Sequence, residues 1–140
     1  MKIIICGSIT AAQEILDIQK QLVANGHEVE IPHGVKHEFY HGRTEIPNEE
    51  KADDKIQNDV IRAYYEKIKN SDALLIANVP KRGVEGYIGG NTFLEMGFGH
   101  VLNKHLYCLY PLPDLSYKAE LQAMQPTILN GDLSKLRKQP

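Results

Sequence analysis

The chain has 140 residues, which is the size of one compact domain and leaves no room for two lobes. Charged residues make up 24% and the formal net charge is -2, so the chain lacks the basic field that general nucleic-acid binding requires. Its longest apolar stretches fall far short of the roughly 20 residues that cross a bilayer, so we expect neither a membrane span nor a signal peptide.

Cys6 and Cys108 are the two cysteines, and both lie inside apolar runs. A disulfide scaffold is therefore excluded, and the two thiols are expected to be small core residues in a reducing compartment. Together with the composition, this predicts a single cytoplasmic domain over residues 1–140 that does not associate with membranes.

The first part of the chain predicts a strand, a helix and a second strand. Ile3–Cys6 is a continuous apolar run that ends at Gly7-Ser8, which is typical of a strand buried on both faces of a parallel sheet. From Thr10 to Asn25 the apolar residues recur every three or four positions, which predicts a helix. His27–Pro32 then predicts a short outer strand, because a proline closes it. The region from Pro32 to Asp54 is irregular.

The clearest helical pattern spans Ala52 to Ile68, where every fourth residue is apolar or aromatic and the residues between are polar. Ser71-Asp72 ends this helix. The elements predicted after it are a strand at Ala73–Ala77, a helix at Thr92–Leu102, a strand at Leu106–Tyr110, a helix at Ser116–Met124 and a strand at Thr127–Leu129.

Strands that alternate with helices predict an α/β fold with right-handed crossovers. We expect a flavodoxin-like or Rossmann-like three-layer sandwich around a five-stranded parallel sheet in the order 2-1-3-4-5. In such a sheet a ligand binds at the carboxyl ends of the strands, near the switch between strands 1 and 3. The loops at that edge are expected to be 7–10, 78–92 and the segment after Tyr110.

The loop Gly7-Ser8-Ile9-Thr10 allows two interpretations. Its amides and the hydroxyls of Ser8 and Thr10 would suit a phosphate or sugar at a helix N-terminus. Alternatively, Gly7 makes a tight turn and a hydroxyl caps the helix. The loop lacks the further glycines of a dinucleotide-binding or Walker A motif.

Glu95 is the residue of greatest interest, because two adjacent glycines precede it and it is expected in the first turn of a helix at the ligand edge. From the pattern alone, Thr92-Phe93-Leu94-Glu95 fits a capping box, in which Glu95 bonds back to the cap.

Other polar groups are expected to be structural. His33, His37 and His41 are four residues apart, but Gly34 and Gly42 argue against a helix that would present them to a metal, so we expect loop histidines and no metal site. Asp72 is expected to be a turn residue at the edge away from the ligand. The acidic run Glu45–Asp54 is expected to be a solvated loop and helix start.

Three segments together resemble the nucleoside 2-deoxyribosyltransferase family, including its branch that hydrolyses 2'-deoxynucleoside 5'-monophosphates. The segments are Cys6-Gly7-Ser8-Ile9, the strand from Ser71 to Ile76, and Gly89-Gly90-Asn91-Thr92-Phe93-Leu94-Glu95-Met96-Gly97. The resemblance covers nearly the whole chain, and the segment around Glu95 is the most specific.

The resemblance implies that Glu95 is the nucleophile that attacks the anomeric carbon, with Met96-Gly97 completing the family's Glu-x-Gly pattern. It also implies that Gly7 and Ser8 lie against the sugar or its 5'-phosphate. Leu121-Gln122-Ala123-Met124 resembles a segment that completes the site of a neighbouring subunit, which implies a homodimer or a larger homo-oligomer.

The chain departs from the family at four positions. Gly89 and Tyr64 stand where the transferases have helper aspartates, Gln122 stands where Asn or Ser is usual, and Asn91 stands where glycine is usual. These departures favour hydrolysis over base exchange, because base exchange needs a group that activates the incoming base. Asn91, Tyr64, Tyr65 and Glu85 are candidate replacements.

The predicted function is cleavage or transfer of an N-glycosidic bond in a nucleoside or nucleoside 5'-monophosphate, through a covalent glycosyl-Glu95 intermediate. The alternative is a catalytically inactive nucleotide-binding module of the same fold. No cofactor, nucleic-acid partner or metal is expected. Besides Glu95, the candidate substrate-binding residues are Gly7, Ser8, Ile9, Gly89, Gly90, Asn91, Tyr64, Gln122 and Met124.

Overall fold

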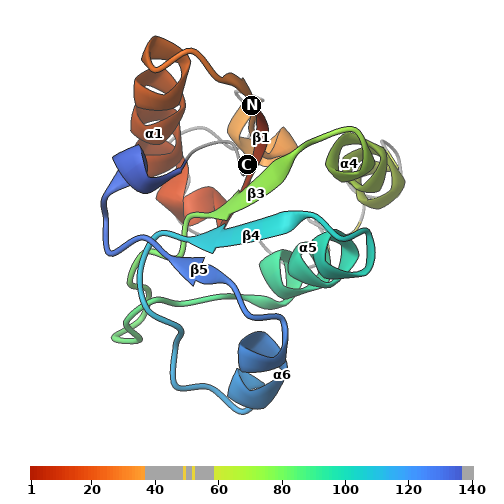
Figure 1. Ribbon diagram of the computed structural model, residues 1–140. Coiled ribbons are helices and arrows are strands. Elements are labelled where there is room, and N and C mark those ends of the chain that lie inside the picture. The colour runs from red at the N-terminus through yellow and green to blue at the C-terminus, as the bar shows by residue number, and fades with distance from the viewer. Residues whose placement is uncertain (37–48, 50–51, 53–58, 137–140) are drawn as a thin grey trace.

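The computed structural model describes residues 1–36, 49, 52 and 59–136. Five parallel strands form one sheet in the order β2-β1-β3-β4-β5, which confirms the predicted fold class and strand order. The carboxyl ends of β3, β4 and β5 point the same way, toward the left of Figure 1. The strands are β1 (Lys2–Cys6), β2 (Glu28–Glu30), β3 (Ala73–Ile76), β4 (His105–Cys108) and β5 (Thr127–Ile128).

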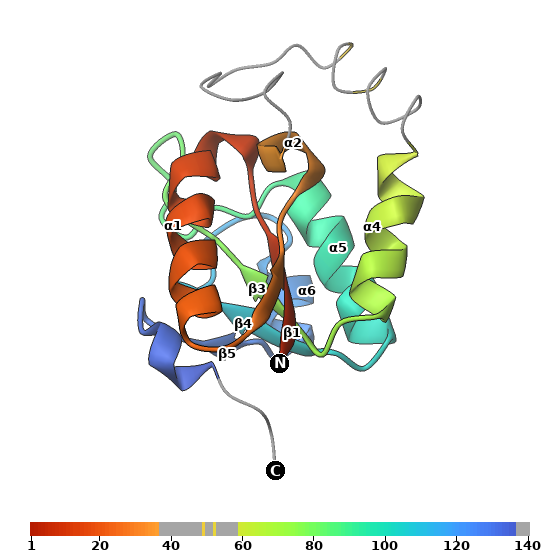
Figure 2. The ribbon, with the colours of Figure 1, turned by 90° about the horizontal axis from the view of Figure 1, so that it is seen from above.

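The helices cover both faces of this sheet, with α1 on one side and α4 and α5 on the other (Figure 2). Short 3-10 turns, η1 and η2, precede α1 and follow β5. The helical elements are η1 (Ile9–Ala11), α1 (Ala12–Ala24), α2 (His33–Lys36), α4 (Val60–Lys69), α5 (Gly90–Val101), α6 (Lys118–Ala123) and η2 (Leu133–Lys135).

The alternation of side chains along β1 explains its continuous apolar sequence. Ile3 and Ile5 face α1, whereas Ile4 and Cys6 face α4 and α5, and all four are at most 1% exposed. Cys108 on β4 is buried in the same layer as Cys6, and both thiols are free, so the prediction that the cysteines are core residues is confirmed. Buried apolar side chains therefore fill the layer on each face of the sheet.

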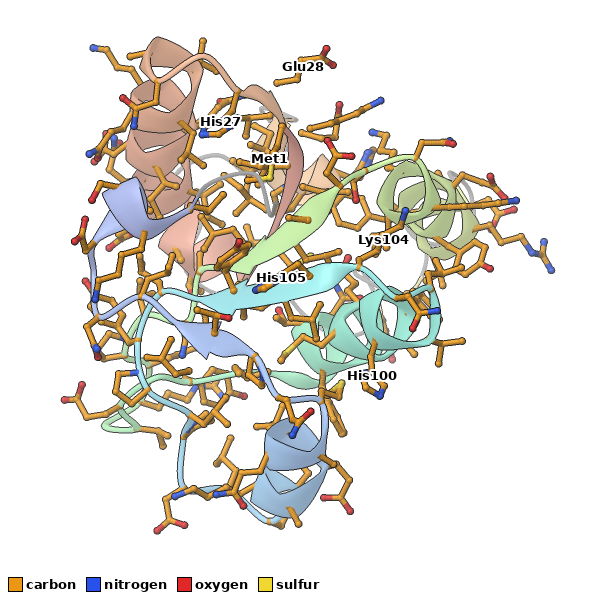
Figure 3. The ribbon with its side chains drawn as sticks, viewed as in Figure 1. Met1, His27, Glu28, His100, Lys104 and His105 are labelled. Carbon is orange, nitrogen blue, oxygen red and sulfur yellow. The ribbon has the colours of Figure 1, made fainter. Side chains whose placement is uncertain are left out.

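The amino-terminal edge of the sheet carries structural contacts. The backbone N–H of Lys2 donates to Asp72 Oδ2 at 2.8 Å, which confirms the structural role expected for Asp72. The terminal amine of Met1 lies 3.0 Å from His27 Nδ1, and the two residues adjoin in Figure 3. Partial burial, followed by the charge of that amine, lowers the pKa of His27 below its usual value.

The start of α5 differs from the prediction. The helix begins at Gly90 rather than Thr92, its N-cap is Gly89, and no side-chain cap bond is made, so the capping-box interpretation is wrong. The ladder opens with the bond from Phe93 N–H to the Gly89 carbonyl at 2.9 Å. Glu95 therefore lies in the second turn, on the buried face that also carries Thr92 and Met96.

The prediction of a loop around His33 is also wrong, because His33 and Gly34 lie in the single turn α2. The Val35 N–H donates to the Pro32 carbonyl at 3.0 Å at the start of this turn, and the intrinsic penalty of about 1 kcal/mol for a helical glycine does not prevent the turn from forming. The described residues do not include His37, His41, Gly42 or Ile56. Of the acidic run Glu45–Asp54, they include only positions 49 and 52.

Within the part of the chain that the structure describes, no three metal-ligating side chains of His, Cys, Asp or Glu come together. The same part contains no helix that is both long and apolar enough to span a bilayer.

Candidate active site

The loops after β1, β3 and β4 meet at the carboxyl edge of the sheet, and the buried amide of Asn78 joins two of them. Its Nδ2 donates to the carbonyl of Tyr110 at 2.8 Å and lies 3.3 Å from the carbonyl of Pro111 and 3.4 Å from that of Gly86. Its Oδ1 accepts from the Tyr110 N–H at 3.0 Å. Sequence reasoning missed this residue, although a single polar side chain directly after the apolar run of β3 is a signal that could have identified it.

Gly86 allows the same two loops to approach closely. Its φ is +66°, and a Cβ placed there would lie 2.2 Å from the Pro111 carbonyl oxygen. A side chain at this position would therefore require both a left-handed backbone and a displaced neighbouring loop. Asn78 and Gly86 together therefore hold the loops after β3 and β4 close to each other.

Glu95 is 7% exposed and belongs to a cluster built from three elements. The thiol of Cys6, at the end of β1, forms a hydrogen bond with the Glu95 side chain. The phenol of Tyr64, on α4, lies near both Cys6 and Glu95. It donates its own hydrogen bond to the Ile5 carbonyl. A carboxylate buried in such a cluster costs stability, which is typical of a functional group.

The surroundings of Cys6 and Tyr64 favour the protonated forms of both groups. Burial, then the charge of Glu95 and the hydrogen bond to it, raise the pKa of the Cys6 thiol well above its usual value. Burial likewise raises the pKa of Tyr64 well above its usual value, and the neighbouring Cys6 and Glu95 raise it further. Cys6 is therefore a neutral S–H that donates to the Glu95 side chain.

The loop after β1 carries a second polar group. Ser8 is the N-cap of η1, and its Oγ lies 2.8 Å from Thr10 Oγ1 and accepts from the Thr10 N–H at 3.3 Å. Ser8 therefore caps the 3-10 turn η1, whereas Ala11, the N-cap of α1, makes no side-chain cap bond. Lys81, from the loop after β3, donates from Nζ to the same Ser8 Oγ at 3.2 Å. Gly7 is buried, and a Cβ there would lie 3.1 Å from Ile15 Cδ1.

The other predicted site residues fall on three segments. Gly89 and the exposed Gly90 and Asn91 form the start of α5, and Asn91 precedes Glu95 by one turn on the same helix face. Gln122 is exposed on α6, and Ile9 is partly exposed in η1.

The segment leading into α6 is tied to the start of α5 by aromatic residues. The Tyr117 ring stacks on Phe93 with centroids 4.7 Å apart, and its hydroxyl donates to the Ile88 carbonyl. Met124, just after α6, packs against the same apolar layer as Met96. Of the candidate helper groups, Tyr65 packs edge-on against Phe98 at 5.2 Å, and Glu85 is exposed in the loop after β3.

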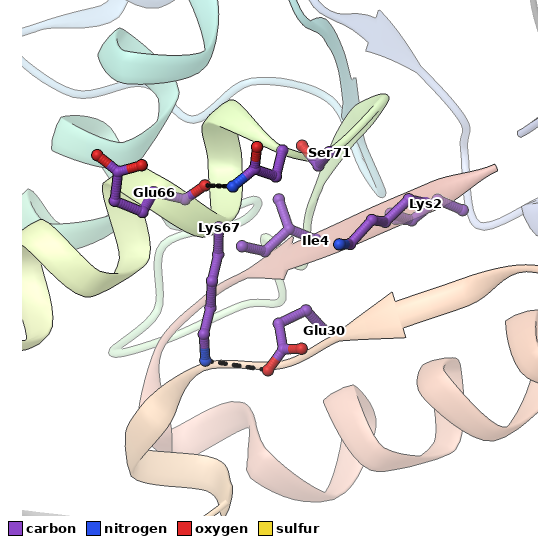
Figure 4. Close-up of a pocket in the computed structure, with 8 residues that line it drawn as sticks. Lys2, Ile4, Glu30, Glu66, Lys67 and Ser71 are labelled. Carbon is purple, nitrogen blue, oxygen red and sulfur yellow. Dashed lines mark hydrogen bonds and ion pairs between the residues drawn. The ribbon is translucent and has the colours of Figure 1, made fainter.

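A small cavity lies elsewhere, over the amino-terminal half of β1 (Figure 4). Its volume is about 140 Å³, below the roughly 300 Å³ of small ligand pockets, and the ion pair between Lys67 and Glu30 at 3.0 Å crosses it. None of the predicted site residues lines it. The lining residues are Lys2, Ile3, Ile4, Glu30, Glu66, Lys67, Asn70 and Ser71.

No protein-family model and no curated protein matches the chain. Eleven chains of solved structures do, among them the following two. A CMP N-glycosidase from Clostridium botulinum is 18% identical, with a TM-score of 0.54, and the match covers 97% of this chain and 98% of that chain. A 2-deoxyribosyltransferase from the psychrotolerant bacterium Bacillus psychrosaccharolyticus is 20% identical, with a TM-score of 0.52, and the match covers 82% of this chain and 76% of that chain.

The chain has the fold of these two enzymes. At such identities the likeness defines the architecture, and it agrees with the family resemblance of the three sequence segments described above.

Proposed function

We propose that the protein cleaves the N-glycosidic bond of a nucleoside or nucleoside 5'-monophosphate, with Glu95 as the nucleophile. The observation that carries this proposal is the buried carboxylate of Glu95 at the carboxyl edge of the sheet, beside the Cys6 thiol. The fold shared with an N-glycosidase and a deoxyribosyltransferase supports it.

The proposed reaction has two displacement steps. A Glu95 oxygen attacks the anomeric carbon, the bond to the base breaks, and the base departs and takes up one proton. Water then attacks the same carbon, the ester bond breaks, and the proton released balances the one taken up. Two inversions give net retention, and water is the only co-reactant.

Hydrolysis is favoured over base exchange because helper carboxylates are missing from two positions. Gly89 contributes only backbone, and Tyr64 keeps its raised pKa and its hydrogen bond to the Ile5 carbonyl. Neither residue offers a group with a pKa near neutrality that would activate an incoming base.

The direct test incubates the protein with the common nucleosides, 2'-deoxynucleosides and their 5'-monophosphates and measures free base by chromatography. We expect release from at least one substrate, and free sugar rather than a new nucleoside when a second base is added. If no substrate releases base while one of them raises the melting temperature, the protein is a nucleotide-binding module and the proposal is wrong.

We also propose that the protein is a homo-oligomer, at least a dimer, in the cytoplasm. Its free buried thiols suit a reducing compartment. Apolar residues on the outer helices support association, because Ile61 is 44%, Leu94 43% and Val101 78% exposed. Sedimentation equilibrium of the same preparation measures the mass, and a monomer would contradict the oligomer.

Cys6 is proposed as a positioning residue for Glu95. Replacing it with alanine removes one donor from the carboxylate, so we expect kcat to fall about tenfold. The acid limb of the pH–rate profile should move to higher pH, because the anionic form loses a hydrogen bond. Cys6→Ser, which restores a donor, should recover most of the activity.

The matched control is Cys108→Ala. Cys108 is equally buried in the same layer, and burial alone raises its pKa, to about 12. This variant should lose similar stability while keeping kcat and the pH profile. If Cys6→Ala and Cys108→Ala behave alike in both, Cys6 is only a packing residue.

A further inference from the structure

The ring of Tyr87 lies directly beside Gly89, the N-cap of α5. A Cβ placed on Gly89 would lie 3.3 Å from Tyr87 Cε1 and 3.5 Å from its hydroxyl oxygen. A longer side chain at position 89 would therefore crowd the ring. Position 89 is also one of the two at which the transferases carry a helper aspartate, so in this chain a phenol hydroxyl stands next to the place where that carboxylate is missing.

Two neighbours define where the half-buried Tyr87 ring lies. The Lys81 ammonium is 5.5 Å from the centre of the ring, and it donates to Ser8 Oγ at 3.2 Å, so the ring is close to the loop after β1. The second neighbour is Tyr117: burial raises the pKa of the Tyr117 phenol, and the nearby Tyr87 raises it further. Tyr87 therefore lies at the carboxyl edge of the sheet, near both the loop after β1 and the segment that leads into α6.

The hydroxyl of Tyr87 differs from those of two other tyrosines at this site. Tyr64 donates its hydroxyl proton to the Ile5 carbonyl, and Tyr117 donates its own to the Ile88 carbonyl. Within the part of the chain that the structure describes, the Tyr87 hydroxyl makes no hydrogen bond. Its proton is therefore not used by the fold, and an acceptor on a bound substrate can take it.

The separation of Tyr87 from Glu95 suits two groups on opposite sides of a glycosidic bond. Gly89 precedes Glu95 by six residues, which is about 9 Å along the axis of α5, and side chains on a helix lean toward its start. In retaining glycosidases the acid and the nucleophile are about 5.5 Å apart, because the acid protonates the leaving atom itself. A nucleobase also accepts protons at ring nitrogens and carbonyl oxygens further from the sugar, so an N-glycosidase can use a more distant acid.

We propose that the Tyr87 phenol is the general acid that protonates the departing base. This inference rests on the proposed function, and it assigns one further catalytic residue to that reaction.

The proton transfers balance over the two displacement steps. When Glu95 attacks and the bond from the anomeric carbon to the base breaks, the electron pair of that bond goes to the base, and the Tyr87 hydroxyl proton moves to a nitrogen or oxygen of the base. The nearby Lys81 ammonium stabilises the phenolate that forms. When water attacks the same carbon and the bond to Glu95 breaks, the phenolate takes a proton from that water and the phenol is restored.

The test measures kcat and KM for base release by wild type, Tyr87→Phe and Tyr110→Phe. Tyr87→Phe keeps the ring beside Gly89 and removes only the proton donor, so kcat should fall about 10²- to 10³-fold while KM and the melting temperature stay near the wild-type values. Tyr110→Phe is the matched control, because Tyr110 also follows a strand at the carboxyl edge but its ring lies beside Gly131. This variant should keep kcat within about twofold of wild type.

A substrate whose base leaves without a proton distinguishes a lost acid from a disturbed site. The base of an N7-methylated purine nucleoside is positively charged and departs as a neutral molecule, and a 5-nitro group makes a pyrimidine a better leaving group. With the analogue that matches the preferred substrate, Tyr87→Phe should lose less than about tenfold in kcat, because the missing proton is no longer needed.

The outcomes separate this inference from the proposed function. If wild type releases base and Tyr87→Phe does so as fast as Tyr110→Phe, Tyr87 is not the acid, whereas the role of Glu95 is unaffected. Equal losses on the ordinary substrate and on the analogue would show that Tyr87 only packs against the start of α5, and would also overturn the inference. A wild type that releases no base from any substrate overturns both.

Discussion

Glu95→Gln is expected to reduce base release by at least about 10³-fold while leaving substrate binding intact. A carboxamide keeps the shape and an acceptor oxygen for the Cys6 thiol but is a poor nucleophile toward an anomeric carbon. Because the loss affects only the chemical step, kcat should fall while the melting-temperature shift caused by the substrate remains.

Stability should move in the opposite direction from activity. Glu95 is 7% exposed, so removing its charge relieves a desolvation penalty, and the unliganded variant should melt at the same temperature as wild type or higher. If the variant does not fold, a second measurement on the wild type tests the role of the carboxylate. In mass spectrometry of acid-quenched wild type, the peptide that contains Glu95 should carry the sugar.

Glu120→Gln is the matched control, since it makes the same change at an exposed glutamate on α6. It should keep full activity. Base release by Glu95→Gln at the rate of Glu120→Gln would rule out Glu95 as the nucleophile.

Gly86→Ala is expected to lower the free energy of unfolding by about 2–4 kcal/mol. A side chain at φ +66° is strained by itself, and its Cβ would lie 2.2 Å from the Pro111 carbonyl oxygen, which Asn78 holds in place. The loop after β4 must therefore move, or the hydrogen bonds between Asn78 and that loop must break. For a chain of this length, thermal unfolding should shift down by roughly 10 °C.

Gly97→Ala provides the comparison within α5. A Cβ at Gly97 meets nothing within 4 Å, so this variant should be as stable as wild type or more stable by up to about 1 kcal/mol. Equal melting temperatures for Gly86→Ala and Gly97→Ala would show that the loops after β3 and β4 can move apart without a loss of stability. This result would contradict the importance of the close contact between Gly86 and Pro111.

Several features of the fold follow from the sequence because their causes are local. The run Ile3–Cys6 predicts a strand buried on both faces, since each successive side chain meets a different helix layer. Alternation of strands and helices then restricts the winding to few possibilities, and the order β2-β1-β3-β4-β5 is the predicted one. Glu95 also emerged from the sequence, through the segment that resembles a known family.

The start of α5 was predicted wrongly because glycine is a poor helix former and the Thr92 to Glu95 spacing imitates a cap. In the structure the helix starts two residues earlier, at Gly90, and Thr92, Glu95, Met96 and Gly99 are its buried residues.

The sequence by itself determined the sheet and its order, and it singled out Glu95 as a candidate site residue at the edge of that sheet. The tertiary structure alone decided which groups surround Glu95. Lys81 meets Ser8 across 73 positions, and Asn78 meets Tyr110 across 32. No local pattern encodes such pairs, because they arise only when parallel strands bring their carboxyl ends, and the loops that follow them, to the same edge.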